Sequence, residues 1–360
     1  AAGLATTLSA AGPYTVFAPT NQAFLDLLAE LKISKADLLA NKDFLTSVLT
    51  YHVLGSKVVS SAVPVGQPIT TVQKGYFKAG TLGRSLTITD GRNRVSNVVT
   101  ADVVAQNGVV HTIDKVLLPA NKNVLQTAIA LSTEAQPEFS ILVEAVVAAD
   151  LVTTLSGDGP FTVFAPNNAA FAALLTELGT TKAALLADKP LLTKVLTYHV
   201  VPGLVLKAQV PVGSPITTVQ KDTFTVNAAL AITDQRARSA NITATDVLAS
   251  NGVIHAIDKV ILPANRNIVQ TAQSLPQFSI LVEAVVAANL ADTLSSPGPF
   301  TVFAPTNAAF EKLPEAVRSR YDLSSLKVAI HAAAPCPVPV KQAMIEWWGP
   351  VLFEYYAGSE

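Results

Sequence analysis

The stretch Thr162-Val163-Phe164-Ala165-Pro166 decides the fold, because the same five letters also stand at residues 15–19 and 301–305. The copies lie about 145 residues apart, whereas solenoid and propeller repeats have periods of ~20–50 residues. A unit of this size is long enough to bury a hydrophobic core of its own. The sequence therefore predicts a tandem array of globular domains.

Two further phrases repeat in the same order. Tyr51-His52 returns as Tyr198-His199, and Asn-Gly-Val-Val-His at 107–111 returns as Asn-Gly-Val-Ile-His at 251–255. An Ile-Asp-Lys-Val phrase follows each copy of the second run. The stretch 120–264 carries all of these phrases, so it is interpreted as one complete unit.

A helix is predicted to open the complete unit. Its apolar residues have the spacing i, i+3, i+4, i+7, which places them on one helix face; they are Phe139, Leu142, Val143 and Val146. The third unit repeats this face with Phe278, Leu281, Val282 and Val285. The first unit has no counterpart, because Ala1 aligns with Ala148. The chain is therefore expected to begin inside a domain and to lack that opening helix.

Within the complete unit the local patterns are mixed. Residues 162–165 are rich in β-branched and aromatic residues and are predicted to form a strand. Asn167 or Asn168 is then expected to cap a helix that begins near Ala169. Residues 181–199 are predicted to be helical, and residues 230–233 alternate like a half-buried strand. Asn251-Gly252 predicts a tight hairpin. Helices early and strands late favour the α+β class.

The composition excludes several functional classes. The 360 residues carry 25 Lys and Arg against 26 Asp and Glu, which argues against nucleic acid or an anionic membrane as the main partner. Half of the residues are hydrophobic, so the chain is not disordered. No apolar run approaches the ~20 residues of a membrane span. A single cysteine, Cys336, excludes an internal disulfide and a zinc site built on cysteines.

The repeated phrases resemble the two signatures of the fasciclin (FAS1) domain family. Thr-Val-Phe-Ala-Pro-Thr-Asn-x-Ala-Phe stands at 15–24 and 301–310, and 162–171 has Asn167 in place of the second Thr. The Asn-Gly-Val-Ile-His-x-Ile-Asp-Lys signature stands at 107–115 and 251–259, and the Tyr-His pair lies between the signatures. The resemblance implies tandem wedge-shaped domains of strands and packed helices. It also implies extracellular adhesion or matrix binding without catalysis.

The resemblance suggests four segments. Residues 1–119 form a fasciclin-like domain without its opening helix, 120–264 a complete one, and 265–312 the start of a third. Residues 313–360 are similar to an internal piece of AMP-forming acyl-CoA synthetases, with Tyr356, Ser359 and Glu360 near the place of their adenylate motif. An inactive ligase fragment, or a chimeric chain, is therefore the alternative to an adhesion protein.

Six residues are candidates for ligand or adhesion contact: Tyr51, His52, Asp102, Tyr198, His199 and Asp246. The Tyr-His pairs lie in a region linked to receptor binding in animal members of the family, although closing the core at a helix end is the stronger expectation. Asp102 and Asp246 correspond to an adhesion motif just before the second signature, with turn capping as the alternative. No catalytic, cofactor-binding or metal-ligating residues are expected, because no motif for them is present.

The function expected from the sequence is a secreted, non-enzymatic adhesion or surface-binding protein. Its partner is expected to be an extracellular-matrix or cell-surface protein or glycan, and self-association stays open. The expected location is extracellular or at the cell surface, and no cofactor is expected.

Overall fold

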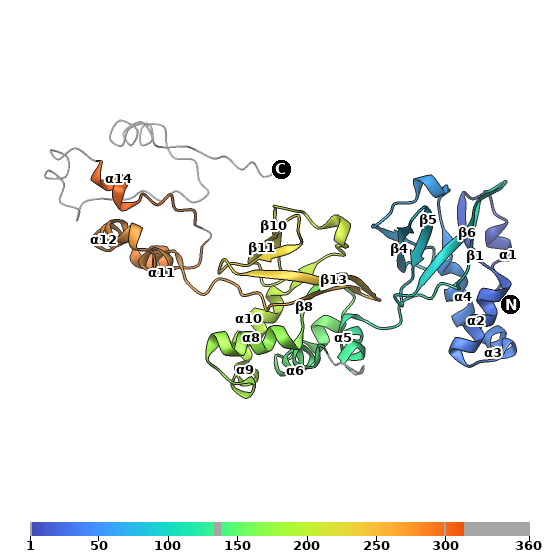
Figure 1. Cartoon of the computed structure of the whole chain (residues 1–360), viewed down its shortest axis with the longest axis horizontal. Helices are drawn as coiled ribbons and strands as arrows, with labels where there is room; N and C mark the ends of the chain where they lie inside the picture. The colour runs from blue at the N-terminus through green and yellow to red at the C-terminus, as the bar shows by residue number, and fades with distance from the viewer. Residues whose placement is uncertain (1, 133–137, 299, 313–360) are drawn as a thin grey trace. The chain divides into compact units, whose positions relative to one another are not determined.

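A computed structural model describes residues 2–132, 138–298 and 300–312. The chain divides into two compact units, Ala1–Pro263 and Ala264–Glu360. The first unit contains the first two repeats, and the second begins with the third-repeat sequence (Figure 1). Residues 313–360, including those that resemble acyl-CoA synthetases, lie outside the described range.

Seven strands of the first repeat form one sheet in the order β2-β1-β7-β6-β5-β4-β3. The first-signature strand β1 pairs in parallel with the second-signature strand β7, which places Phe17 opposite His111. The two signatures are therefore neighbours in one sheet although they are far apart in the chain. The strands are β1 (Tyr14–Pro19), β2 (Val53–Leu54), β3 (Pro68–Thr70), β4 (Tyr76–Leu82), β5 (Ser85–Thr89), β6 (Val95–Ala105) and β7 (Gly108–Ile113).

The second repeat has the same topology, with the strand order β10-β11-β12-β13-β14-β8-β9. Its signature strands β8 and β14 are parallel, and Phe164 lies opposite His255. The strands are β8 (Phe161–Pro166), β9 (Val200–Pro202), β10 (Pro215–Thr217), β11 (Thr223–Val226), β12 (Ala231–Thr233), β13 (Ser239–Ala249) and β14 (Gly252–Ile257). The predicted strand at 162–165 and the Asn-Gly hairpin are confirmed, and the α+β class holds for both repeats.

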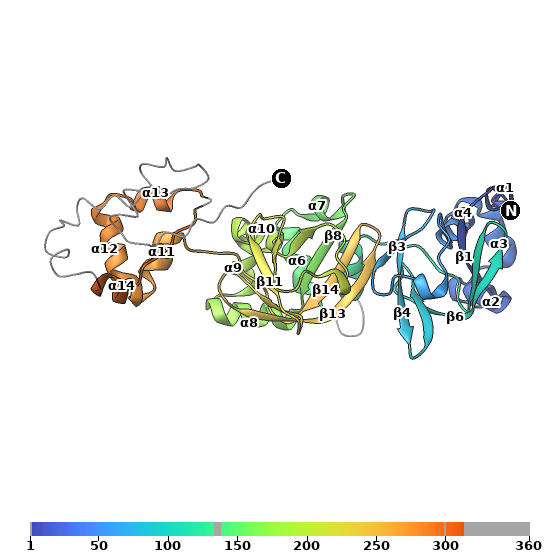
Figure 2. The ribbon, with the colours of Figure 1, turned by 90° about the horizontal axis from the view of Figure 1, so that it is seen from above.

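Helices of the second repeat gather on one side of its strands (Figures 1 and 2). They are α5 (Val124–Ser132), α6 (Ser140–Ala148), α7 (Val152–Ser156), α8 (Asn168–Leu178), α9 (Lys182–Ala187) and α10 (Lys189–Tyr198). The 3₁₀ turn η2 (Lys207–Gln209) follows β9. The first repeat has α1 (Ala5–Leu8), α2 (Asn21–Leu31), α3 (Lys35–Ala40), α4 (Lys42–Tyr51) and η1 (Ser60–Ala62). The predicted opening helix is α6; Phe139, which directly precedes it, and Leu142 and Val146 within it are buried in the helical core.

The helix predicted over 181–199 is in fact two helices, α9 and α10. Asp188 ends the first and caps the second, because its carboxylate accepts a hydrogen bond from the Leu191 N–H at 3.0 Å. Pro190 follows in the first turn of α10, where a missing N–H costs nothing. A proline inside one continuous helix would have removed a hydrogen bond, so the sequence does carry the signal for this break.

The two asparagines predicted as alternative caps both act as caps, but on different helices. The Asn167 side chain accepts from the Ala170 N–H at 2.9 Å and begins α8. The Asn168 side chain accepts from the Ile141 N–H at 3.0 Å, at the start of α6. Asn167 therefore fixes the chain where it passes from β8 into α8, and Asn168 fixes the start of α6.

The second unit is built from helices in the residues that the structure describes. They are α11 (Ile268–Gln273), η3 (Pro276–Phe278), α12 (Ser279–Ala287), α13 (Ala291–Ser295) and α14 (Asn307–Glu311). Leu281 and Val285 pack in a small core, as their spacing predicts. Phe303 of the third signature is 77% exposed, whereas Phe17 and Phe164 are buried. The difference has a physical cause, since the latter two lie on strands that pair with a second-signature strand.

Candidate functional site

Tyr51 and His52 lie at the end of α4 and are both buried. The Tyr51 hydroxyl donates to the Tyr76 carbonyl at 2.6 Å. The Leu117 N–H donates to Nε2 of His52 at 2.8 Å, so Nδ1 carries the proton and donates to the Val48 carbonyl at 2.7 Å. Burial lowers the pKa of His52 to about 4, and the ring is therefore neutral at neutral pH.

Tyr198 and His199 repeat this arrangement at the end of α10. The Tyr198 hydroxyl donates to the Thr223 carbonyl at 2.7 Å, and His199 bridges the Val195 carbonyl and the Ile261 N–H. Burial lowers the pKa of His199 to about 4 as well. Both Tyr-His pairs thus have the contacts of a closed core at a helix end, and their side chains are covered by protein.

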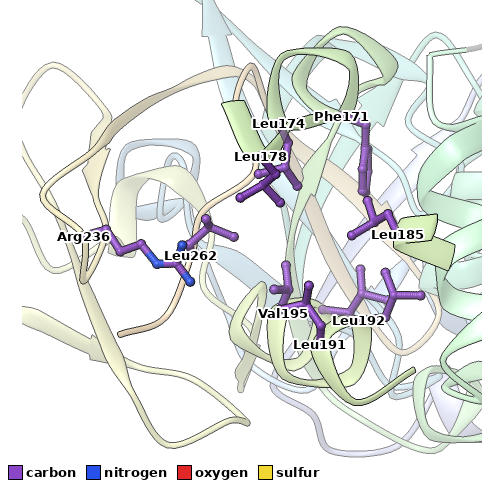
Figure 3. A pocket seen from close by; sticks show the side chains of 10 residues that line it. Phe171, Leu174, Leu178, Leu185, Leu191, Leu192, Val195, Arg236 and Leu262 are labelled. Atoms are coloured by element: carbon purple, nitrogen blue, oxygen red, sulfur yellow. The ribbon is translucent and has the colours of Figure 1, made fainter. Parts of the chain in front are cut away.

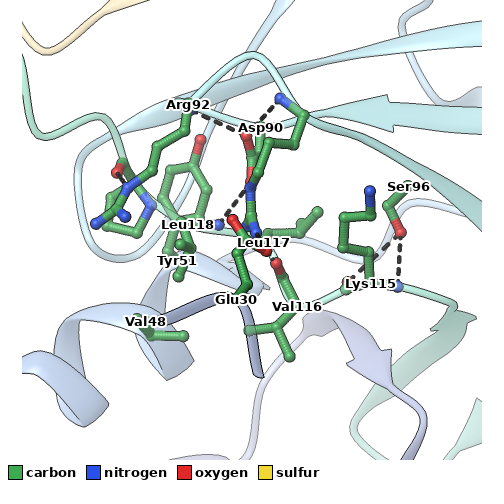
Figure 4. A network of polar contacts seen from close by, with 12 residues as sticks. Glu30, Val48, Tyr51, Asp90, Arg92, Ser96, Lys115, Val116, Leu117 and Leu118 are labelled. Atoms are coloured by element: carbon green, nitrogen blue, oxygen red, sulfur yellow. Dashed lines mark hydrogen bonds and ion pairs between the residues drawn. The ribbon is translucent and has the colours of Figure 1, made fainter. Parts of the chain in front are cut away.

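A charged network that was not predicted from the sequence connects the turn after β5 to the segment that follows β7 (Figure 4). One carboxylate oxygen of Asp90 accepts from the Leu118 N–H at 2.9 Å and from the Arg94 guanidinium at 2.7 Å. Arg94 also reaches Glu30 on α2 at 2.7 Å. Asp234, Arg238 and Glu177 repeat the network in the second repeat. The signal was the recurrent Asp-x-Arg-x-Arg pattern at 90–94 and 234–238.

Asp102 and Asp246 occupy matching bulges in β6 and β13. Both have a left-handed backbone, with φ of 60° and 62°. The register of pairing with the next strand shifts across each of these positions. The Asp102 N–H donates to Nδ1 of His111 at 3.2 Å. The Asp246 N–H donates to Nδ1 of His255 at the same distance. Each bulge therefore places its carboxylate beside a 3₁₀ turn, η1 in the first repeat and η2 in the second.

The two carboxylates differ in what covers them. Asp102 accepts hydrogen bonds from the hydroxyl and the N–H of Ser60, which lower its pKa, and its side chain is 40% exposed. Asp246 accepts from the Lys207 N–H at 2.7 Å and pairs with the Lys78 ammonium at 3.0 Å. The side chain of Asp246 is only 7% exposed, because the first repeat packs on it.

The contact between the two repeats involves three side chains of the first, Tyr76, Lys78 and Asn93, here called the Tyr76 face. The Tyr76 hydroxyl lies within hydrogen-bond distance of two carbonyls, those of Ala249 and Gly252, which share its one proton. The Tyr76 side chain also packs in a cluster with Leu206 and Leu248 of the second repeat. Burial raises the pKa of Tyr76, so its hydroxyl stays protonated and donates. The contact is therefore apolar at its centre and includes one ion pair.

The surface that receives the Tyr76 face is here called the second bulge face and consists of Leu206, Asp246 and Leu248. Its counterpart in the first repeat, here called the first bulge face, consists of Val59, Asp102 and Val104. Leu206 and Leu248 are 0% and 1% exposed, whereas Val59 and Val104 are 38% and 73% exposed. The same part of the fold is thus covered in one repeat and open in the other.

A small cavity lies under α8 and α10 of the second repeat (Figure 3). Its volume is about 50 Å³, and leucine and other apolar side chains line it together with Arg236. A cavity that binds benzene in another protein measures ~150 Å³. The cavity is therefore too small for an organic ligand, and it has no convergent polar groups for catalysis.

The described residues contain no cluster of three or more His, Cys, Asp or Glu side chains that would hold a metal ion. The helices found in residues 2–132, 138–298 and 300–312 are each too short or too polar to span a bilayer.

Comparison with known proteins identifies the repeats. A model of the fasciclin domain matches residues 1–119, 137–263 and 276–331. Transforming growth factor-beta-induced protein ig-h3 of Sus scrofa is 28% identical over 320 residues, which cover 89% of this chain and 43% of that protein. Protein sll1483 of Synechocystis is 51% identical over 128 residues, or 35% of this chain and 67% of that protein.

A solved structure of a FAS1 domain pair from the insect cell adhesion molecule Fasciclin I covers 72% of this chain and 91% of its own, at 20% identity and a TM-score of 0.37. The chain spans less than half the length of the ig-h3 relatives. The family model alone covers well over half of the residues, in three tandem matches. The chain therefore belongs to the fasciclin domain family.

Proposed function

We propose that this chain is a non-enzymatic, extracellular adhesion or surface-binding protein, and that it contacts its matrix or cell-surface partner through the first bulge face. One observation carries the proposal. The second bulge face is a protein contact surface, and the first bulge face has the same backbone geometry but is exposed. Membership of the fasciclin family supports the adhesive role, since the sequence resemblance implies it.

The chemistry of the first bulge face suits a protein partner. Val104 and Val59 are exposed apolar side chains, and the Asp102 carboxylate binds Ser60, the residue that follows Val59. The Asp102 carboxylate is charged at physiological pH, since the hydrogen bonds from Ser60 lower its pKa further below neutrality. An apolar patch with one fixed charge favours a partner surface that combines apolar area with a basic group.

The remaining sequence candidates take supporting roles in this proposal. Asp246 is the partner of Lys78, and the two Tyr-His pairs hold the ends of α4 and α10. Asp102 is therefore the candidate whose side chain a ligand reaches first.

Cell attachment to wells coated with the full chain tests the proposal. Asp102→Lys and Val104→Glu should each lower attachment at least about tenfold, because a buried charge pair or apolar anchor contributes ~1.4 kcal/mol or more. Leu82→Glu is the matched control, since Leu82 is 72% exposed on the separate β4–β5 hairpin. Attachment that is insensitive to Asp102→Lys and Val104→Glu would contradict the assigned surface.

The non-enzymatic part has its own test. Incubation of the full chain with ATP, coenzyme A and a fatty acid should release no AMP above a buffer control. Steady AMP release would favour the acyl-CoA ligase interpretation of residues 313–360 instead.

A further inference from the structure

We propose that the first bulge face docks the Tyr76 face of a second copy of this chain whose own repeat contact has opened. The inference deepens the proposed function and rests on it, because it names a partner for the same surface. It is drawn from the contact that the chain already makes between its first and second repeats.

Backbone register places the same hydrogen-bonding groups on both bulge faces. Each β-hairpin has a two-residue turn, so the flanking pair, Ala105 and Gly108 in the first repeat, is the hydrogen-bonded pair. The next pair, Val104 and Val109, is then non-hydrogen-bonded, and the N–H and C=O of Val104 point to the outer edge of β6. Leu248 has the matching register, and there Asn93 binds both of its backbone groups.

Charge and apolar surface match in the same way. Lys78 pairs with Asp246, and Asp102 presents a carboxylate at the equivalent bulge. Tyr76 packs beside Leu206 and Leu248, and Val59 and Val104 offer smaller apolar side chains at those positions. The first bulge face therefore has the charge, the apolar anchors and the backbone edge that the Tyr76 face recognises.

The second repeat cannot supply this partner. Its residues at the positions of Tyr76, Lys78 and Asn93 are Thr223, Thr225 and Ala237, which lack the ring, the cation and the amide. The Tyr76 face of the same chain is already engaged with its own second repeat. A second copy can dock only when its own repeat contact has opened. The contact within one chain is normally favoured, because the two repeats are linked and have a high effective concentration.

A full-length Leu248→Lys variant is the probe for this docking. The introduced ammonium group would be buried in the cluster where Leu248 packs with Tyr76, and the cost of burying that charge opens the repeat contact and frees the Tyr76 face. The second repeat should remain folded, because Val104 at the matching position is 73% exposed without harm. In surface plasmon resonance, this variant should bind immobilised wild-type chain at least about tenfold more tightly than wild-type analyte does.

Variants of the immobilised chain locate the contact. Asp102→Lys or Val104→Lys on the surface should weaken binding of the probe by about tenfold, and Leu82→Lys should leave it unchanged. Asp246→Asn is the second probe in case the first folds poorly, since asparagine tolerates the positive φ of 62° at this position.

Hydrogen exchange decides the outcome independently of binding. Faster exchange of the backbone amide at position 248 in either probe shows that the contact has opened. An opened probe that does not bind wild-type chain overturns the docking proposal. If Asp102-dependent cell attachment persists in that case, only the partner is wrong; if it is also absent, the proposed function fails with it.

Discussion

Asn93 and Leu248 bind each other through two hydrogen bonds across the contact between the first and second repeats. The Asn93 amide nitrogen donates to the Leu248 carbonyl at 3.1 Å, and the Leu248 N–H donates to the Asn93 side-chain oxygen at 2.6 Å. The side chain thus pairs with the outer edge of β13 as another strand would. A free strand edge is a general site of protein association, and Asn93 covers it here.

Asn93→Ala should loosen this contact. The substitution removes two hydrogen bonds and exposes the backbone edge at Leu248, so the free energy of unfolding of the two-repeat unit should fall by about 1–3 kcal/mol. Amide exchange at Leu248 should accelerate at the same time. Gln22→Ala is the control, because Gln22 makes one exposed bond within α2. Unchanged protection of Leu248 would count against the described contact.

Asp90→Asn should destabilise the first repeat far more than loss of a surface ion pair. It leaves the guanidinium of Arg94 next to a neutral amide in a mostly buried site, which costs about 3 kcal/mol by urea unfolding. Lys182→Ala is the comparison, since it breaks the pair with Glu144 in which both side chains are 45% exposed. That loss should stay below about 1 kcal/mol. Similar losses for the two variants would refute the clamping role of Asp90.

Stability should fall as the pH drops below 6.5, because buried histidines resist protonation; burial lowers the pKa of His255 as well as those of His52 and His199. The pKa of His52 and of His199 is lowered from 6.5 to about 4. The unfolded chain therefore binds more protons between these values, and each histidine removes about 1.4 kcal/mol per pH unit as the pH falls. Their contribution is complete above pH 6.5 and is lost toward pH 4.

Urea unfolding between pH 5 and 6 measures this slope before most carboxylates begin to titrate. The double variant His52→Gln and His199→Gln should be less stable at pH 7 but show a flatter pH dependence. A wild-type chain with equal stability at pH 5 and pH 6.5 would rule out the burial of neutral imidazoles.

Gly252→Ala should prevent the second repeat from closing its sheet. A Cβ at this position would lie 2.1 Å from the backbone oxygen of Phe161, so β14 and β8 would have to separate. The expected loss is about 3 kcal/mol or more, read by thermal unfolding. Gly55→Ala is the matched control, since its added Cβ would meet nothing within 4 Å. If Gly252→Ala lost no more stability than Gly55→Ala, the described pairing of β14 with β8 would be contradicted.

Local patterns were sufficient for much of the fold. The strand at 162–165, the Asn-Gly hairpin and the apolar face of α6 follow from residue type and spacing, because neighbouring residues determine them. The break between α9 and α10 was also encoded, in Asp188 and Pro190, but the apolar pattern of the longer stretch concealed it.

The candidate site could be predicted only in part. The repeated sequence identified Asp102 and Asp246 as equivalent. Their different exposure depends on Lys78 of the first repeat, which covers Asp246 of the second and whose own counterpart there is Thr225. A pattern within one repeat contains no information on which face its neighbour covers. The Asp90 network was visible as a recurrent Asp-x-Arg-x-Arg, although its partners Glu30 and Leu118 come from distant parts of the chain.

A charge exchange between two copies tests the central claim most directly, which is that the first bulge face receives the Tyr76 face. The Asp246→Asn probe with Lys78→Asp added should bind immobilised wild-type chain about tenfold more weakly, and so should the original Asp246→Asn probe on immobilised Asp102→Lys. The account predicts that the Lys78→Asp probe regains binding on the Asp102→Lys surface, because the ion pair re-forms with reversed sign. Additive losses without recovery would contradict it.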